Sequence, residues 1–257
     1  MTTDLESLTA RRPVILDGAM ATMLSAGTPV DSLCLTHPCR VAAIHRAYIE
    51  AGADIIATDS FLTSDPATIG ASVRIARGEA DRAGRKVWVA GCLGPALGPE
   101  ETRAKARRLI EAGADILMLE SQLSTALVHA LSGMAGEIPL MVSATPRADG
   151  TLHSGESLRD LARAAETAGA FSVGLNCGDG PEAMSEHLRC LRELTSLHVS
   201  CHPSAGLPGH TLGPEPMAAI LAEIANEGLA DIIGGCCGTT PAHIRALAQA
   251  VSKPEMP

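Results

Sequence analysis

The stretch Glu50-Ala-Gly-Ala-Asp-Ile-Ile56 returns 61 residues later as Glu111-Ala-Gly-Ala-Asp-Ile-Leu117. Weaker copies are Thr167-Ala-Gly-Ala-Phe-Ser-Val173 and Asn226-Glu-Gly-Leu-Ala-Asp-Ile-Ile233. Each copy has the pattern of a helix that ends on a glycine in the left-handed conformation and is followed at once by a buried strand. The repeat therefore predicts four helix-to-strand junctions spaced 56 to 61 residues apart along the chain.

A period near 60 residues corresponds to two strand–helix units, so a further strand should lie between successive copies. Short apolar runs occur where this predicts, at residues 14–16, 87–90, 138–142 and 197–199. Such continuous, β-branched runs are typical of parallel strands that are buried on both faces. We therefore predict eight strands, which begin near residues 14, 54, 87, 115, 138, 171, 197 and 231.

Helical patterns fill the segments between these strands, and several begin with proline or an acidic residue, which is a helix-start signal. The clearest run over residues 38–51, 100–112, 157–168, 181–194, 214–226 and 241–251. Eight strand–helix alternations in 257 residues match one (β/α)8 TIM barrel, a fold of about 250 residues. We expect residues 1–257 to form this single α/β domain; an open doubly wound sheet is the alternative.

The composition excludes several classes of protein. Hydrophobic residues make up 46% of the chain, as in a globular domain, while the net charge of −9 argues against nucleic-acid binding. The basic run 103–108 is interleaved with apolar residues and is interpreted as the solvent-exposed face of a helix. No apolar run is long enough to span a membrane, and the N-terminus lacks the pattern of a signal peptide. We therefore expect a cytoplasmic protein.

In a barrel of this kind the chemistry lies beyond the C-terminal ends of the strands. Polar and thiol side chains gather at these predicted ends, which together form one rim. The ends are Asp17-Gly18, Thr58-Asp-Ser-Phe61, Gly91-Cys92, Glu120-Ser121, Ser143-Ala144, Asn176-Cys177, Cys201-His202 and Gly234-Gly-Cys-Cys237. Of the nine histidines, only His202 is a candidate site residue.

Three of the eight cysteines could converge on this rim. Cys177 ends the sixth strand, and Cys236 and Cys237 follow the eighth in a glycine-rich turn that can direct both side chains to one point. Three thiolates suit zinc, and three protein ligands leave a fourth position open, as in catalytic sites. A substrate thiol fits that position. Three unconnected core cysteines, or a strained Cys236–Cys237 disulfide, are the structural alternatives.

Several motifs resemble the homocysteine S-methyltransferase family, which includes the homocysteine-binding domain of cobalamin-dependent methionine synthase. They are Leu16-Asp-Gly-Ala-Met20, Leu35-Thr-His-Pro38 with the stretch 45–54, Val173-Gly-Leu-Asn-Cys177, Ala205-Gly-Leu-Pro208 and Ile232-Ile-Gly-Gly-Cys-Cys-Gly-Thr-Thr-Pro-Ala-His-Ile244. The resemblance extends over nearly the whole chain and implies a barrel that methylates homocysteine in methionine biosynthesis. The methyl donor would be attacked in line by a zinc-bound thiolate.

The resemblance also implies roles for individual residues. The zinc ligands would be Cys177, Cys236 and Cys237, and Asp17 and Glu120 would bind the ammonium group of homocysteine. The substrate site is expected to be completed by four further residues of the same rim, namely Gly18, Thr58, Phe61 and Asn176.

The chain departs from the family pattern on the side of the methyl donor. Asp59 adds a carboxylate after the second strand, and the loop over residues 94–100 is unusually short. Only four aromatic residues are present, and of these we expect only Phe61 and Trp88 near the rim, so an aromatic cage for betaine is disfavoured. The donor is then S-methylmethionine, S-adenosylmethionine, or methylcobalamin on a partner corrinoid protein. Alternatives are a subunit that passes methyl from a corrinoid protein to another thiol, and a non-catalytic zinc- or thiol-binding protein.

Overall fold

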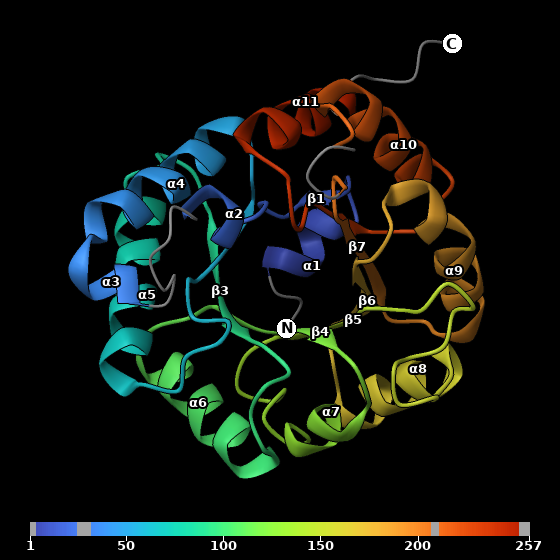
Figure 1. Cartoon of the computed structure of the whole chain (residues 1–257), viewed down its shortest axis with the longest axis horizontal. Helices are drawn as coiled ribbons and strands as arrows, with labels where there is room; N and C mark the ends of the chain where they lie inside the picture. The colour runs from blue at the N-terminus through green and yellow to red at the C-terminus, as the bar shows by residue number, and fades with distance from the viewer. Residues whose placement is uncertain (1–3, 25–31, 207–210, 252–257) are drawn as a thin grey trace.

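The computed structural model describes residues 4–24, 32–206 and 211–251, so Leu207 and Pro208 of the fourth motif lie outside the described residues. Eight parallel strands alternate with helices, and the helices surround the strands (Figure 1). The strands pair in the order β1-β8-β7-β6-β5-β4-β3-β2, and a parallel bridge between Leu16 and Ile55 joins the two outer strands. The sheet is thus closed, which confirms the (β/α)8 barrel over the open sheet.

The strands begin within two residues of the predicted positions. They are β1 (Val14–Ile15), β2 (Ile55–Ala57), β3 (Trp88–Leu93), β4 (Ile116–Gln122), β5 (Leu140–Ala144), β6 (Ser172–Cys177), β7 (His198–Pro203) and β8 (Ile232–Ile233). The helices that follow the strands are α2 (Ala21–Leu24), α3 (Leu33–Thr36), α4 (Pro38–Ala51), α5 (Pro66–Asp81), α6 (Pro99–Glu111), α7 (Ala126–Ala130), α8 (Leu158–Ala168), α9 (Pro181–Leu194), α10 (Pro214–Asn226) and α11 (Pro241–Val251). Among the described residues, none of these helices has the length and apolar character that crossing a membrane requires.

The four glycines of the repeat adopt the predicted left-handed conformation. Gly52 and Gly169 cap the C-termini of α4 and α8, with φ of 112° and 73°. Gly113 and Gly228 follow α6 and α10 with φ of 99° and 71°. A residue with a side chain is strained in this conformation, so glycine lets each helix turn directly into the next strand.

The aspartates of the repeat have a role that the sequence did not reveal. Each precedes a strand and accepts a hydrogen bond from a backbone amide of the strand before it. The pairs are Ile15 with Asp54 at 3.0 Å, Val89 with Asp115 at 2.8 Å, and Val199 with Asp231 at 2.7 Å. The repeated aspartate therefore links neighbouring strands at the N-terminal end of the barrel.

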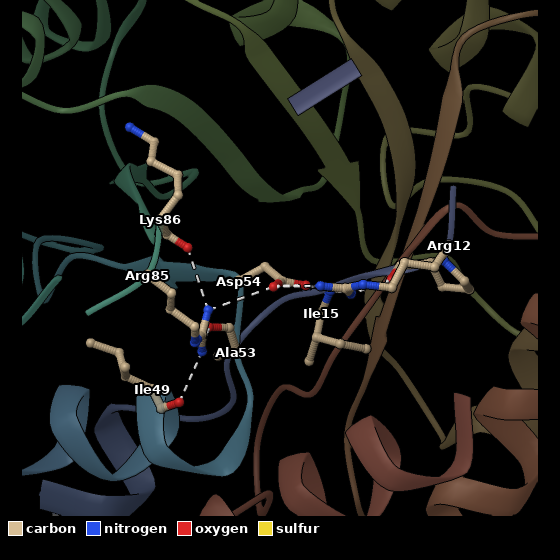
Figure 2. Close-up of polar contacts among 8 residues, drawn as sticks. Arg12, Ile15, Ile49, Ala53, Asp54, Arg85 and Lys86 are labelled. Carbon is tan, nitrogen blue, oxygen red and sulfur yellow. Dashed lines mark hydrogen bonds and ion pairs between the residues drawn. The ribbon is translucent and has the colours of Figure 1, made fainter. Parts of the chain in front are cut away.

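Asp54 makes the most extensive of these links (Figure 2). Its two carboxylate oxygens accept hydrogen bonds from the guanidinium group of Arg12 at 2.8 and 2.9 Å. Arg85 approaches to 3.7 Å and donates to the carbonyl groups of Ile49 and Ala53. The buried carboxylate thus holds together the junction between β1 and β2, where the ladder consists of a single bridge.

Apolar side chains fill two layers, one between strands and helices and one inside the barrel. The inner layer includes Leu5 from α1 (Asp4–Thr9), a helix that lies at the centre of the barrel in Figure 1. Trp88 belongs to the same layer. It is the first residue of β3, at the end of the barrel opposite the predicted rim, so the expectation that it lies near the site was wrong. Phe61 follows β2 and is partly buried, and the buried Tyr48 also reaches the rim, where its hydroxyl donates to the carbonyl of Ala19 at 2.8 Å.

Candidate metal and substrate site

The three candidate zinc ligands come together at the C-terminal ends of the strands. Cys177 ends β6, and Cys236 and Cys237 follow β8. Their sulfur atoms all lie within 4.8 Å of one another, and the Cys177 and Cys236 sulfurs are 2.7 Å apart. Among the described residues this is the one group of three or more such side chains close enough to hold a metal ion. Each thiol is free, and Cys237 is exposed.

The turn after β8 gives both adjacent cysteines access to one point. Thr239 packs so closely over Gly235 that a side chain there would meet its atoms at 2.5 Å. The Thr239 hydroxyl donates to the carbonyl of Cys236 at 2.7 Å. The backbone amide of Cys236 donates to Pro203 of β7, and that of Ala205 donates to Cys237, each at 2.9 Å. These bonds replace the regular strand alternation, which would send neighbouring side chains to opposite faces.

Backbone strain is concentrated beside the thiols. Ser121 and Cys177 are the non-glycine residues with left-handed backbone in the described parts of the chain, with φ of 57° and 59°. Each such conformation costs about 1–2 kcal/mol. The buried side chain of Asn176 bonds to both residues. Its oxygen accepts from the backbone amide of Ser121 at 2.9 Å, and its nitrogen donates to the Ser121 hydroxyl at 2.7 Å and to the Cys177 sulfur at 3.4 Å. Strain of this kind is common where a site is preorganised.

The thiols are electrostatically coupled in a way that suits a soft cation. Hydrogen bonds from Cys177 and Cys236 lower the pKa of Cys237 to about 3. The contacts with Cys177 and Cys237 raise the pKa of Cys236 in turn. The cluster therefore favours the thiolate form at Cys237, with two further sulfurs packed beside it. Three soft donors that all lie within 4.8 Å of one another suit zinc, and three protein ligands leave a fourth position open.

Two carboxylates lie at the same rim. The Asp17 side chain is buried and accepts a hydrogen bond from the Ala57 amide at 2.9 Å, and the partly buried Glu120 accepts one from the Cys92 thiol at 2.7 Å. Burial raises the pKa of both groups. The charge of Glu120 raises the pKa of Asp17 further, and the charge of Cys237 raises the pKa of Glu120 further. Neither carboxylate forms an ion pair within the described chain, so the pair is suited to a cationic ligand.

The other predicted substrate residues lie at the rim but are bonded to the protein. The Thr58 hydroxyl accepts from the Cys92 amide at 3.0 Å, and the Phe61 carbonyl accepts from the Gly94 amide at 3.0 Å. Gly18 provides close approach, because a side chain there would meet the Thr239 hydroxyl at 2.6 Å. The side chain of Asn176 bonds to the two residues with strained backbone, as described above.

Two residues of the site were not singled out from the sequence. Lys105 lies in the basic run that was interpreted as a solvent-exposed face, but its side chain is buried, and its ammonium group donates to the carbonyls of Ser60 and Phe61. Cys92, at the predicted end of the third strand, is buried, and its thiol contacts Glu120. The inward-facing position at the end of a strand was the available signal for Cys92. His202 is buried, and its Nε2 atom has no hydrogen-bond partner in the described residues.

Comparison with known proteins gives a consistent result. The profile of the homocysteine S-methyltransferase family matches residues 14–251. Methionine synthase of Mycobacterium tuberculosis is 34% identical over 99% of this chain, and the match covers 26% of that protein. The chain therefore spans about a quarter of the length of this curated relative.

Solved structures of the homocysteine methyltransferase MmuM from Escherichia coli match almost from end to end. The metallated form superposes with a TM-score of 0.82 at 27% identity, covering 96% of this chain and 99% of that one. The apo form gives a TM-score of 0.79 at 29% identity, with 95% and 97% coverage.

Proposed function

The chain belongs to the homocysteine S-methyltransferase family, and on that premise we propose that it transfers a methyl group to the thiol of homocysteine, which yields methionine. The observation that carries the proposal is the combination at one rim of three sulfurs within 4.8 Å and two carboxylates that form no ion pair in the described chain. A thiol with an ammonium group a few bonds away is complementary to both features.

We propose Cys177, Cys236 and Cys237 as the residues that hold zinc. When bound, zinc lowers the pKa of a substrate thiol brought to it, so that the thiol is available as a thiolate near neutral pH. The chain supplies a preorganised ligand set, because Asn176 and the turn after β8 hold the three sulfurs close together before any substrate arrives.

Asp17 and Glu120 have the complementary task of binding the ammonium group. Each carboxylate has one oxygen bonded to the protein and thereby held in orientation. A cation between them relieves their mutual repulsion and favours the charged form of both. With the amino-acid end fixed there, the substrate sulfur is directed to the cysteine cluster, whose Cys237 lies close enough to influence the pKa of Glu120.

The reaction is then a direct displacement. A bond forms between the substrate sulfur and the methyl carbon, while the bond from that carbon to the donor breaks and its electron pair leaves with the donor. No proton is lost from the methyl group, so no general base is required there. Orientation of two reactants in this manner can contribute about 7–11 kcal/mol to lowering the barrier.

The rim favours a large carrier of the methyl group over a small donor. The large apolar side chains that are exposed in the described residues all lie in segments that follow strand ends, namely Met23, Leu35, Leu62 and Leu123. Exposed apolar side chains at the same end of a barrel are a feature of interaction surfaces. We therefore propose methylcobalamin on a corrinoid protein as the donor, with a sulfonium compound as the second candidate.

The test uses purified chain supplied with zinc and homocysteine, and methionine is measured by mass spectrometry. S-methylmethionine, S-adenosylmethionine, betaine and methylcobalamin are offered in turn, the last both free and on a corrinoid protein. We expect methionine with a corrinoid donor and none with betaine. Cys236→Ser should abolish production, whereas Cys190→Ser, at an exposed thiol outside the cluster, serves as the matched control. Absence of methionine with every donor would refute the proposal.

A further inference from the structure

Cys92 lies inside the barrel and has no part in the reaction as proposed. In β3 the side chains of Val89 and Leu93 belong to the outer apolar layer, while Ala90 and Cys92 face the interior. The Cys92 side chain is 1% exposed, and its sulfur lies 2.7 Å from Oε1 of Glu120. A carboxylate has no hydrogen to donate, so the thiol must be the donor in this contact. Cys92 is therefore a hydrogen-bond donor to one oxygen of Glu120.

The backbone of Cys92 is held on both sides, so the thiol has a defined position. Its amide donates to the Thr58 hydroxyl at 3.0 Å, and its carbonyl accepts from the Ser60 hydroxyl at 2.8 Å. The Thr58 and Ser60 hydroxyls are themselves 2.9 Å apart. The buried ammonium group of Lys105 donates to the Ser60 carbonyl from behind. The loop after β2 is thus anchored to the end of β3, and Cys92 projects from this anchored unit.

Glu120 has no comparable support of its own. It lies immediately before Ser121, the residue with left-handed backbone, at the point where the pairing of β4 with β5 becomes irregular. In the described chain the Cys92 thiol is the side-chain donor that contacts its carboxylate, and no ion pair holds it. With Oε1 occupied by the thiol, Oε2 is the oxygen left to face a ligand. The rotation of the carboxyl group, and hence the direction of Oε2, depends on Cys92.

We propose that Cys92 is a positioning residue, which orients the Glu120 carboxylate toward the ammonium group of the substrate. This inference rests on the proposed function, in which that carboxylate binds homocysteine. It assigns to the thiol neither metal binding nor a step in methyl transfer. Its effect is confined to the recognition of the amino group, and this distinguishes it from a residue that merely fills the barrel.

The experiment measures binding of two ligands to zinc-supplied protein by isothermal titration calorimetry. Homocysteine is compared with 4-mercaptobutyrate, the same molecule without its amino group. Cys92→Ala removes the donor, and Cys92→Ser restores one. Cys201→Ala is the matched control, since Cys201 is equally buried but faces the outer layer beside Met184. Zinc content is measured for each variant.

We expect Cys92→Ala to weaken homocysteine binding about fivefold to tenfold, the scale of one ordinary hydrogen bond, because a thiol is a weak donor. The substitution should leave 4-mercaptobutyrate binding unchanged. Cys92→Ser should recover most of the affinity, and Cys201→Ala should alter neither ligand. In a Glu120→Gln background the further change Cys92→Ala should have little effect, because the two residues act through one contact.

Three results would overturn the inference. Equal weakening of both ligands would show that Cys92 supports the barrel in general, and loss of zinc from Cys92→Ala would make it a metal ligand. Unchanged homocysteine affinity in Cys92→Ala would show that Glu120 needs no such donor. If the unsubstituted protein binds 4-mercaptobutyrate as tightly as homocysteine, or methylates no homocysteine, the proposed function itself fails, which is a separate outcome.

Discussion

Replacement of Asp54 by alanine tests the role of the repeated aspartate in closing the barrel. The substitution removes the acceptor of the buried Ile15 amide, which costs about 1–3 kcal/mol when no other partner replaces it. It also removes two hydrogen bonds from Arg12, whose partial exposure limits their contribution to about 1 kcal/mol. We expect the free energy of unfolding to fall by about 3 kcal/mol in total, the sum of these two contributions.

The assay is urea denaturation followed by circular dichroism and by the fluorescence of Trp88. This residue is the single tryptophan and pairs with Ile55, the residue after Asp54, so it reports on the affected region. A loss of 3 kcal/mol corresponds to a decrease of about 6–12 °C in Tm for a chain of this size. The matched control is Asp115→Ala, which removes the acceptor of one strand amide in the same sequence context but at a more exposed carboxylate.

We expect Asp115→Ala to lower the free energy of unfolding by about 1–2 kcal/mol, which is less than for Asp54→Ala. The Asp115 carboxylate is better hydrated, and β3 and β4 pair over more residues than β1 and β2 do. Asp54→Asn should fall between Asp54→Ala and the unsubstituted protein, since an amide oxygen can still accept from Ile15. The reasoning would be refuted if the free energy of unfolding of Asp54→Ala lay within 1 kcal/mol of that of the unsubstituted protein, or if Asp115→Ala lowered it more than Asp54→Ala.

Three further predictions concern the site. Because burial raises the pKa of Glu120, the folded metal-free protein binds a proton more tightly there than the unfolded chain does, so the free energy of unfolding should decrease as pH rises above the ordinary carboxyl range. Glu120→Gln should make this decrease smaller in urea denaturation, and the buried Asp17 should account for a remaining part of it. A chelator should increase the number of thiols that react with a thiol reagent by three, and Cys236→Ser should abolish the increase; an unchanged count would exclude a metal held by these sulfurs. Leu62→Glu should reduce methyl transfer from a corrinoid protein about tenfold, as for an anchoring interface residue, and leave transfer from S-methylmethionine unchanged in the methionine assay; equal loss with both donors would contradict a docking role.

Much of the framework could be read from local patterns. The repeated glycine marks each helix end because only glycine takes the left-handed conformation without strain, and the apolar runs beside it locate strands to within two residues. Position at a strand end then selected Cys177, Cys236 and Cys237, because parallel strands in a closed barrel bring their C-terminal ends to one rim. These inferences depend on neighbours in the sequence and on the known geometry of one fold.

Other features depend on contacts between distant segments, and the sequence carried no local sign of them. Lys105 reads as an exposed basic residue, yet it is buried because the loop after β2 offers it carbonyl oxygens. Trp88 was expected near the site but lies in the inner layer with Leu5, whose helix α1 was not predicted. The orientation of Glu120 likewise depends on Cys92, 28 residues earlier in the chain.

The sequence by itself therefore determined the eightfold alternation and the candidate ligands, because both follow from periodicity and from backbone preferences of single residues. Only the tertiary structure decided how the sulfurs converge, which carboxylate oxygens are already bonded and which buried groups support them. These depend on side-chain packing across strands that are far apart in the chain, and no local pattern encodes such distances.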